Sequence, residues 1–441
     1  MADHPVLGLY SLAIGLATPL LRRKLRRRAE TEPGYALAVP ERFGVYDIAP
    51  RGPSEAGRPL IWIHAVSLGE TRAAAILLKE LRELLPQMQL LLSNGTATGR
   101  EEGRKLLRGG DIQVWQPWDS RQAVGRFLRN FRPDIGVLME TEIWPNLVAG
   151  CKARGIPLVL ANARMNEKSW RGAKRFAWLA RPAYRSLRAV WAQTESDARR
   201  LTDIGAPVRA VLGNLKFDSV PDARLLARGR GWRAASARPV VLFASSREGE
   251  EAAWLHAWLA AREALAQRGQ QVQWLLVPRH PQRFDEVMAL CADAGLTVSR
   301  RSTWADEPPT ADVWLGDSMG EMAQYYGMAH AAMLGGSFEP LGGQNLIEAL
   351  SCDCPVIMGP HTFNFAEAAE LAAEAGVALR AADMHEGVTE AVRLVNEPAR
   401  LADLASRCHA FTSAHRGAAR STAWAVVEQM RSTPQPGAAG G

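Results

Sequence analysis

Short apolar runs that alternate with helical patterns are the feature that most limits how this chain can fold. In the first half such runs lie at 61–66, 88–93, 112–117, 135–140, 156–162, 189–194 and 208–214, and helical spacing is clear at 71–85, 121–131 and 145–154. A second set of apolar runs follows at 240–246, 272–279, 313–318, 331–336, 355–360 and 377–383. This alternation predicts an α/β fold with two doubly wound domains, each a parallel sheet covered by helices on both faces.

A polar, basic stretch without a strand pattern separates the two sets, and we predict a linker at 219–238. The first domain is then expected at 29–218 and the second at 239–432. Two such domains of similar size predict a ligand cleft between them. The small, polar residues at 433–441 are typical of a disordered tail.

The N-terminus joins an uncharged apolar run to a basic one. Val6 to Leu21 carries no charge, and RRKLRRR follows at 22–28. The apolar run is shorter than the roughly 20 residues of a spanning helix, and the lack of a small-residue cleavage site argues against a removed signal peptide. We predict that residues 1–28 are a membrane anchor whose basic end binds anionic headgroups or stays in the cytoplasm. A buried helix with a solvated basic end is the alternative.

The composition is that of a globular protein with an anionic partner. With 441 residues, 47% of them hydrophobic, the chain is neither a multi-span membrane protein nor a disordered one. Its net charge of +7 suits nucleic acid, anionic lipid or nucleotide, but no known nucleic-acid-binding module accompanies it. The five cysteines have no zinc-ligand spacing, so we predict reduced thiols.

Glu70 has two interpretations that the sequence leaves open. It follows Ser67 by three residues at a strand-to-helix junction, which is the pattern of a capping box and is worth about 1 kcal/mol of helix stability. The same junction lies at the carboxyl end of a parallel strand, where α/β proteins place their active-site crevices. Glu70 therefore caps its helix, takes up a proton in a reaction, or does both, and the local pattern favours capping.

Three loops of the second domain carry polar residues directly after predicted strands. The segment 335–350 leads through glycines to a helix start at Asn345, which predicts a phosphate site. Arg279 and His280 suit a phosphate ester, and the loop 317–321 offers carboxylates to a ribose or a base edge. Each loop alone is typical of an ordinary turn. Three together favour a nucleotide-binding domain, although neither a Walker loop nor a G-x-G-x-x-G fingerprint is present.

The first domain has its own candidates at strand ends. Glu140 and Glu142 follow a strand, where they either complement the dipole of the next helix or take part in chemistry. Lys216 follows the last strand, where it is either solvated or reaches the cleft. Between them, residues 164–190 interleave arginines and lysines with aromatic residues, a pattern that suits an anionic amphiphile.

Nine short motifs along the chain occur together, in this order, in one known family. They are HAVSLGE, METEIWPNL, NARM, AQTESD, GNLKFD, VPRHPQRF, GDSMGEM, GGSFEPLGGQNLIEA and MGPHTFNF. On these motifs the chain resembles the 3-deoxy-D-manno-octulosonic acid (Kdo) transferases of Gram-negative bacteria, from the apolar N-terminus to about residue 420. The resemblance implies a glycosyltransferase of the GT-B fold, with two Rossmann-like domains around a central cleft and an N-terminal membrane-anchor helix.

The resemblance also implies the reaction. Such enzymes move Kdo from CMP-Kdo to the 6'-hydroxyl of a tetraacyl lipid A precursor (lipid IV-A), invert the anomeric centre and release CMP, in lipopolysaccharide core biosynthesis. The implied location is the cytoplasmic face of the inner membrane. The implied partners are CMP-Kdo, the lipid A precursor and the anionic membrane surface, with no nucleic acid, no cofactor and no metal.

Matching the motifs residue by residue implies individual roles. Glu70 is similar to the general base that deprotonates the acceptor hydroxyl, and Glu140 and Lys216 are similar to groups that stabilise the transition state. An inverting transfer needs one such base and a stabilised leaving group. The CMP-binding positions are matched by Arg279, His280, Met319, Gly320, Glu321, Asn345, Leu346, Ile347 and Glu348.

Two departures and two rival functions accompany the resemblance. The chain has HAVSLGE where a Val before the Gly is more usual, and GGQNLIEA where GGHNPLEA is frequent; without that Pro the helix start keeps an additional amide.

The first rival function is that of a GT-B transferase or epimerase that uses a UDP-sugar, and a donor screen distinguishes it from Kdo transfer. The second is an inert protein docked on anionic membranes through 22–28 and 164–190, which predicts no nucleotide binding.

Overall fold

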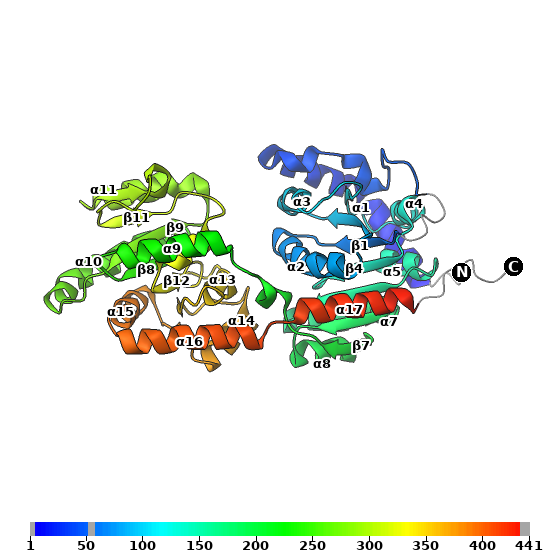
Figure 1. The fold of residues 1–441 in the computed structure, drawn as a ribbon. Coiled ribbons are helices and arrows are strands. Elements are labelled where there is room, and N and C mark those ends of the chain that lie inside the picture. Colours follow the sequence, from blue (N-terminus) through cyan, green and yellow to red (C-terminus); the bar gives the residue numbers. More distant parts are fainter. Residues whose placement is uncertain (1–4, 52–57, 433–441) are drawn as a thin grey trace. The chain divides into compact units, whose positions relative to one another are not determined.

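The computed structural model describes residues 5–51 and 58–432, so the predicted tail at 433–441 lies outside the described residues. The chain divides into two compact units (Figure 1). The first unit consists of the chain up to Asp218 together with the stretch that starts at Gly417, and the second unit is Ser219–Arg416.

The first unit contains a seven-stranded, wholly parallel sheet. Its strands are β1 (Leu60–His64), β2 (Gln89–Asn94), β3 (Ile112–Trp115), β4 (Ile135–Met139), β5 (Leu158–Ala163), β6 (Ala189–Ala192) and β7 (Val208–Val211). Their order in the sheet is β3-β2-β1-β4-β5-β6-β7. The order changes direction between β1 and β4, and in sheets of this type ligands bind outside the carboxyl ends of the strands at that switch point.

Helices cover both faces of this sheet. They are α2 (Leu68–Leu84), α3 (Ala97–Arg104), α4 (Arg121–Phe131), α5 (Pro145–Lys152), α6 (Glu167–Arg175), α7 (Ala177–Arg185), α8 (Glu195–Asp203) and α17 (Ala418–Arg431). Neighbouring residues of β1 point to opposite faces: Ile61 and Ile63 pack with α2 and α17, and Trp62 packs with α4 and α5. The strand is therefore buried on both sides, which explains its unbroken apolar sequence.

The second unit repeats this architecture with a different strand order. Its strands are β8 (Val240–Ser246), β9 (Gln273–Pro278), β10 (Val298–Arg300), β11 (Val313–Leu315), β12 (Ala331–Leu334), β13 (Val356–Met358) and β14 (Ala378–Arg380). They are ordered β10-β11-β9-β8-β12-β13-β14, with the switch point between β8 and β12. Each predicted apolar run forms a strand, and β10 was not predicted, because it is a three-residue, half-buried strand at the sheet edge.

The helices of the second unit are α9 (Ala223–Ala235), α10 (Glu250–Gln267), α11 (Phe284–Asp293), α12 (Met322–Met328), α13 (Leu346–Leu350), α14 (Ala366–Glu374), α15 (Met384–Val395) and α16 (Pro398–Ala414). Tryptophans fill the core between the sheet and α10: the ring centroid of Trp254 lies 5.2 Å from that of Trp258 and 5.3 Å from that of Trp274. Aromatic side chains of this size bury the largest apolar areas available to a core.

The stretch predicted as a linker, 219–238, contains α9 instead. Asp222 caps this helix by accepting hydrogen bonds from the amides of Arg224 (2.9 Å) and Leu225 (3.0 Å). A Cβ at Gly229 would lie 2.1 Å from the carbonyl oxygen of Gln324, so α9 packs backbone to backbone on α12. The helix is missed in the sequence because its contact with the core uses a glycine and one tryptophan rather than an apolar stripe.

The end of the second unit also differs from the predicted boundary at 432. The carboxylate of Asp218 accepts hydrogen bonds from the amides of Gly417 (2.6 Å) and Ala419 (2.8 Å). The helix that begins there, α17, buries Ala423, Val426 and Val427 in the core of the first unit. The C-terminal helix therefore belongs to the N-terminal unit, a crossing that no local pattern indicates.

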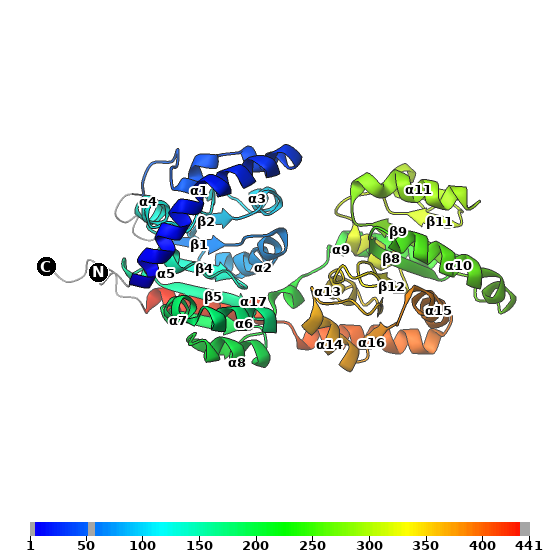
Figure 2. The ribbon, with the colours of Figure 1, turned by 180° about the vertical axis from the view of Figure 1, so that it is seen from behind.

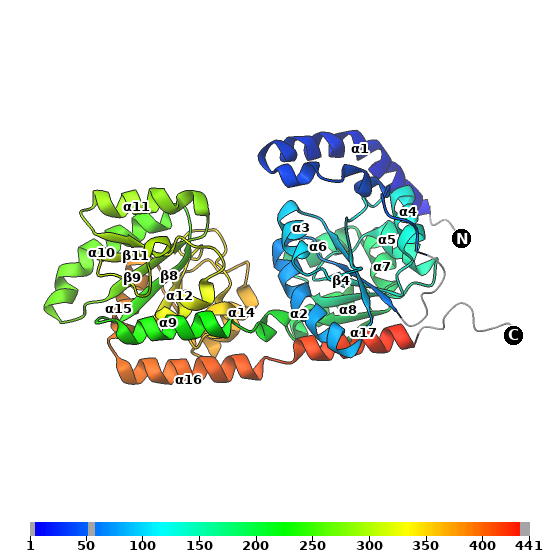
Figure 3. The ribbon, with the colours of Figure 1, turned by 45° about the horizontal axis from the view of Figure 1, so that its top comes forward.

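The predicted anchor forms the helix α1 (Pro5–Thr31), which lies against the first unit in contact with α5 and α7 (Figure 2). Its hydroxyl at Ser11 donates a 2.9 Å hydrogen bond to the side chain of Asn146. Figure 3 shows α1 in dark blue as one continuous helix. Nowhere in 5–51 and 58–432 is a helix both long enough and apolar enough to cross a bilayer.

Candidate active site

Glu70 lies in the first turn of α2, beyond the carboxyl end of β1. One carboxylate oxygen accepts a 2.8 Å hydrogen bond from the amide of Val66, and the other accepts a 2.9 Å hydrogen bond from the hydroxyl of Ser67. Ser67 is the N-cap of α2, and its side-chain oxygen lies 3.4 Å from the amide nitrogen of Glu70. The capping interpretation is thus confirmed, with the carboxylate bound to the amide one residue before the cap.

The surroundings of Glu70 make it easy to protonate. Burial raises the pKa of its carboxyl from the usual 4.5 to about 7, the Val66 amide opposes this rise, and the charges of Glu140 and Glu142 add to it. A carboxyl whose pKa lies near neutrality can exchange a proton with a substrate at working pH, which is what a general base needs. Capping and proton transfer are therefore compatible at this residue.

Glu140 stands directly after β4, across the switch point from β1. It holds a positive φ of 58°, rare for a residue with a side chain. Two backbone hydrogen bonds fix this conformation: its amide donates to Ala161 (3.0 Å), and its carbonyl accepts from the amide of Arg164 (3.1 Å). Its carboxylate is buried and lies 3.3 Å from the amino nitrogen of Lys216. Strained backbone that neighbours over-determine is a frequent mark of functional sites.

Lys216 is positioned by a residue that sequence reasoning quoted only as part of a motif. Asn162, at the end of β5, is buried and has a φ of 52°. Its side-chain oxygen accepts a 3.1 Å hydrogen bond from the amide of Leu215, the residue before Lys216. A single sequence does not indicate that this asparagine adopts a left-handed backbone conformation. The structure thus brings Glu140 and Lys216 into contact. Glu70 is near enough to Glu140 for the charge of Glu140 to raise its pKa.

In the second unit the glycine-rich loop after β12 is held by Glu250, which the sequence did not single out. Glu250 is fully buried at the start of α10. Its carboxylate accepts hydrogen bonds from the amides of Gly336 (2.7 Å), Arg247 (2.9 Å) and Phe338 (3.1 Å). Burial raises the pKa of this carboxyl, and these amides oppose the rise. One side chain therefore ties the loop after β8 to the loop after β12, on the two sides of the switch point.

The helix start at Asn345 differs in detail from the predicted phosphate site. The side chain of Asn345 is the N-cap of α13, accepts a 3.2 Å hydrogen bond from the amide of Ile347, and donates to Glu348 at 3.1 Å. The amide of Ile347 is therefore already in use, and the side chains of Leu346 and Ile347 are fully buried. Among these four predicted CMP-binding residues, Asn345 and Glu348 are the two with side chains that are partly exposed.

Arg279 and His280 lie where predicted, beyond the carboxyl end of β9. The amide of Arg279 donates a 3.0 Å hydrogen bond to the carbonyl of Ser246, the last residue of β8, so this loop also borders the switch point. Burial, with the nearby charge of Arg247, lowers the pKa of His280. The loop thus presents a cation and an imidazole whose pKa is lowered.

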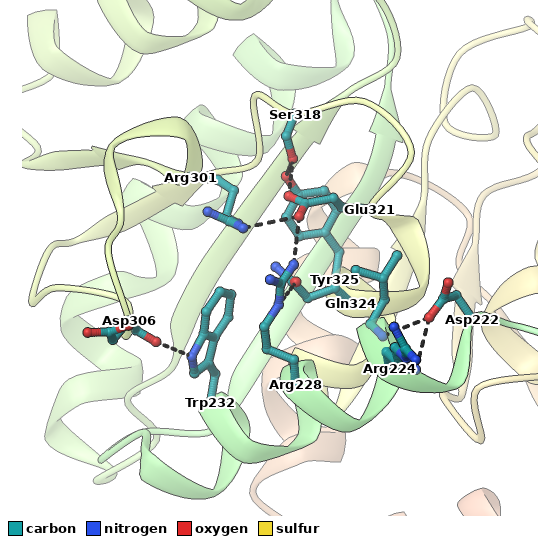
Figure 4. A network of polar contacts seen from close by, with 11 residues as sticks. Asp222, Arg224, Arg228, Trp232, Arg301, Asp306, Ser318, Glu321, Gln324 and Tyr325 are labelled. Carbon is teal, nitrogen blue, oxygen red and sulfur yellow. Dashed lines mark hydrogen bonds and ion pairs between the residues drawn. The ribbon is translucent and has the colours of Figure 1, made fainter.

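Residues 319–321 also follow a strand, but their carboxylate is already paired. Glu321 lies 2.8 Å from a guanidinium nitrogen of Arg228 on α9 and 3.1 Å from one of Arg301, and the hydroxyl of Ser318 donates to it as well (Figure 4). Met319 is 65% exposed and Gly320 has a φ of 83°. A ligand here would meet a carboxylate whose charge two arginines offset.

Comparison with known proteins identifies the family. Residues 38–219 match the family model described as 3-Deoxy-D-manno-octulosonic-acid transferase (kdotransferase). The 3-deoxy-D-manno-octulosonic acid transferase of Bordetella pertussis is 45% identical over 96% of this chain and 99% of its own length. The chain belongs to the Kdo transferase family. The Kdo transferase of Haemophilus influenzae is 32% identical, over 81% of this chain and 83% of that protein.

Solved structures show that this Kdo transferase family member has the GT-B fold. A glycosyltransferase from Rickettsia africae is 12% identical, with a TM-score of 0.56 over 86% of this chain and all of that one. MurG from Acinetobacter baumannii is 14% identical, with a TM-score of 0.52 over 84% of this chain and 99% of that one. At such identity the likeness concerns the fold alone, which two Rossmann-like units in one chain already indicate.

Proposed function

We propose that this chain transfers Kdo from CMP-Kdo to the 6'-hydroxyl of a tetraacyl lipid A precursor, inverts the anomeric centre and releases CMP. The observation that carries the proposal is the carboxyl of Glu70, with its pKa raised to about 7, beside the Glu140–Lys216 pair in a chain that belongs to the Kdo transferase family. The donor already carries its CMP leaving group and Arg279 can meet the phosphate, so the proposed reaction uses no cofactor and no metal.

In the proposed reaction Glu70 removes the proton of the acceptor hydroxyl. The hydroxyl oxygen then forms a bond to the anomeric carbon of Kdo, while the bond from that carbon to the CMP phosphate oxygen breaks. CMP leaves with the bonding electrons, and the attack from the opposite side inverts the centre. A positioned base of this type contributes roughly 10²–10⁴-fold to a rate.

Glu140 and Lys216 stabilise the transition state in this proposal. Lys216 carries the positive charge that can offset the carboxylate of Kdo or the phosphate of CMP, and Glu140 fixes its position through their 3.3 Å contact. A preorganised charge in a site with little water is worth more than the same charge in solution. Because Glu140 is only 7% exposed, its pairing is costly to disturb.

The second unit supplies the CMP-binding residues in the proposal. Arg279 and His280 meet the phosphate, while Glu321, Asn345 and Glu348 offer polar atoms to the nucleoside. Leu346, with a buried side chain, contributes through its backbone amide, and Ile347, whose amide is bound to the side chain of Asn345, supports the helix start. The support is that all three loops follow strands of one sheet, β9, β11 and β12, at the carboxyl edge that binds ligands in doubly wound folds.

The acceptor and the membrane are proposed to meet the first unit. Helix α6 has no buried residue, and Phe176 and Trp178 are about half exposed among its basic neighbours. Helix α1 exposes a stripe of leucines at residues 9, 12, 16 and 20 before its basic run. Aromatic, aliphatic and basic side chains in this combination favour an anionic lipid surface, as expected at the cytoplasmic face of the inner membrane.

A donor screen tests the proposal. The full chain in detergent micelles is given the tetraacyl lipid A precursor with CMP-Kdo, UDP-N-acetylglucosamine or UDP-glucose, and the products are identified by mass spectrometry and NMR. The proposal expects Kdo transferred to the 6'-hydroxyl, CMP released in equal amount to the Kdo transferred, and no product from the UDP-sugars. Transfer or epimerisation with a UDP-sugar alone would establish the first rival. Binding of none of the nucleotides would favour the inert membrane protein.

A further inference from the structure

A large apolar groove runs along α1 on the first unit, and none of the proposed catalytic residues lines it. It lies between α1, the turns at 33–43 and the start of α4, and has a volume of about 1340 Å³. This exceeds the roughly 300–1,000 Å³ of ordinary small-molecule sites. Leu12, Leu25 and Phe43 contribute apolar walls. A groove of this volume with apolar walls suits a hydrocarbon chain better than a compact polar metabolite.

The charges around the groove are all positive. Four arginines line it, and no aspartate or glutamate does among the described residues; the arginines are Arg22, Arg26, Arg121 and Arg126. Arg22 lies over the ring of Phe43 with its guanidinium carbon 4.3 Å from the ring centroid, so the cation is held beside the apolar wall. An apolar groove with a cationic rim is complementary to an anionic amphiphile.

A proline and a glycine of α1 lie at or next to the groove. Pro19 has no amide hydrogen, so the carbonyl of Gly15 loses its intrahelical partner. Gly15 lines the groove, and a Cβ built there would have no heavy atom within 4 Å. A side chain at residue 15 would therefore extend into open space in the groove. Leu12 lines the groove and is also 60% exposed in the leucine stripe of α1, which connects the groove to the lipid-facing side.

We infer that this groove binds one acyl chain of an anionic membrane phospholipid, with the lipid phosphate on the arginines at its rim. The inference rests on the proposed membrane location of the enzyme and assigns the lipid class and the residues that hold it. We assign the groove to a membrane phospholipid rather than to the acceptor because Glu70, Glu140 and Lys216 are absent from its lining. A lipid held in this way would fix α1, and with it the first unit, at the bilayer surface.

Two matched pairs of variants separate the groove from the rest of α1. Arg22→Gln/Arg26→Gln removes two rim charges, and Arg23→Gln/Arg27→Gln removes the same net charge from residues that do not line the groove. Gly15→Leu places an apolar side chain in the groove, and Gly8→Leu places the same side chain elsewhere on α1, where a Cβ also has no heavy atom within 4 Å. The probe is a short-chain phosphatidylglycerol below its micelle concentration, with short-chain phosphatidylcholine as the uncharged comparison, and binding is followed by native mass spectrometry.

The inference predicts one saturable phosphatidylglycerol per wild-type chain and weaker phosphatidylcholine binding. Arg22→Gln/Arg26→Gln should weaken phosphatidylglycerol binding by at least about 10-fold, since a cation at a lipid surface is worth about 1 kcal/mol. Gly15→Leu should weaken this binding by a similar factor, because its side chain occupies space in the groove. The two control variants should bind as the wild type does. Equal loss in both arginine pairs, or unchanged binding in Gly15→Leu, would overturn the inference, because it would show diffuse surface charge.

Kdo transfer is measured on the same preparations to separate this inference from the proposed function. If the wild type transfers Kdo but binds no phosphatidylglycerol, the groove assignment fails and the function stands. If it binds the lipid but transfers nothing, the groove assignment stands and the function fails. If the lipid A precursor displaces phosphatidylglycerol, and Gly15→Leu raises the KM for that acceptor without changing kcat, the groove belongs to the acceptor and our choice of occupant is wrong.

Discussion

The switch points of the two units have the same backbone architecture and opposite chemistry. In the first unit the segments that follow β1 and β4 carry two carboxylates, the partly buried Glu70 and the buried Glu140, with Lys216 against Glu140. In the second unit the buried carboxylate of Glu250 accepts hydrogen bonds from loop amides. The loops at the strand ends there carry glycines, Arg279 and His280, and the charge of Glu321 is offset by two arginines. One edge can accept a proton, whereas the other can receive an anion.

The difference shows what a carboxylate needs in order to act in catalysis rather than only hold a loop in place. Glu250 accepts hydrogen bonds from three amides and is fully buried, so a substrate cannot reach its oxygens. Glu70 accepts two hydrogen bonds and is only partly buried. Since a carboxylate can accept about four hydrogen bonds, Glu70 keeps capacity for an acceptor hydroxyl.

The largest expected effect comes from removing the base of the first unit. Glu70→Gln keeps an oxygen for the Val66 amide but cannot take a proton, so Kdo transfer should fall by roughly 10²–10⁴-fold. The rate is measured at saturating CMP-Kdo, next to a thermal melt. A variant that folds normally and keeps its rate would reduce Glu70 to a helix cap, with Glu140 the next candidate for the base.

The stability of the wild type and that of Glu70→Gln should also depend differently on pH. Folding raises the pKa of Glu70 from 4.5 to about 7, so the folded wild type binds more protons than the unfolded chain between these values. Its stability should therefore fall as the pH rises from 4.5 to about 7 through this group. Glu70→Gln lacks this contribution and should lose less stability over the same window.

The Glu140–Lys216 pair comes next in size. Lys216→Met leaves Glu140 buried without this cation, which should cost up to about 3 kcal/mol of stability, the low end for buried pairs because the lysine side chain is 20% exposed. Transfer should also fall by about 10²-fold. In Glu140→Gln/Lys216→Met most of the stability should return while the rate stays low. A double variant with the wild-type rate would make the pair purely structural.

In the second unit the expected effect on function is smaller and comes only from the position of a loop. Glu250→Ala leaves three loop amides without their acceptor, at roughly 1–3 kcal/mol for each one that stays buried. CMP affinity, measured by calorimetry, should fall by at least about 10-fold through the displaced loop. Glu248→Ala is the matched control, because Glu248 is exposed and its pair with Arg247 is worth little. Unchanged CMP binding in Glu250→Ala would show that the loop does not hold the nucleotide.

The smallest effect concerns the cap of α2. Ser67→Ala should cost about 1 kcal/mol of stability and remove a hydrogen bond that favours the charged form of Glu70. The pKa of Glu70 should therefore rise, and the pH at which transfer reaches half of its maximum should move upward. Ser120→Ala removes the comparable cap of α4 and should leave this pH unchanged. Equal shifts in both variants would contradict the role of Ser67.

Strand positions could be predicted from sequence because buried parallel strands are unbroken apolar runs, as β1 and β4 show. The short, half-buried β10 gives no such signal. The catalytic candidates followed from motifs at strand ends. Asn162 and Glu250 did not, because their roles depend on hydrogen bonds between segments distant in sequence. The return of α17 to the first unit depends on Asp218 in the same way.

The most direct test is the pH dependence of single-turnover Kdo transfer, in the wild type and in Glu142→Gln. Glu142 adds to the raised pKa of Glu70 through its charge and is not itself assigned to catalysis. If Glu70 is the base, the wild-type rate should rise with pH to a plateau, with its midpoint near 7, and the midpoint should move to lower pH in Glu142→Gln. A rate that is flat through pH 7, or a midpoint that does not move, would contradict the account.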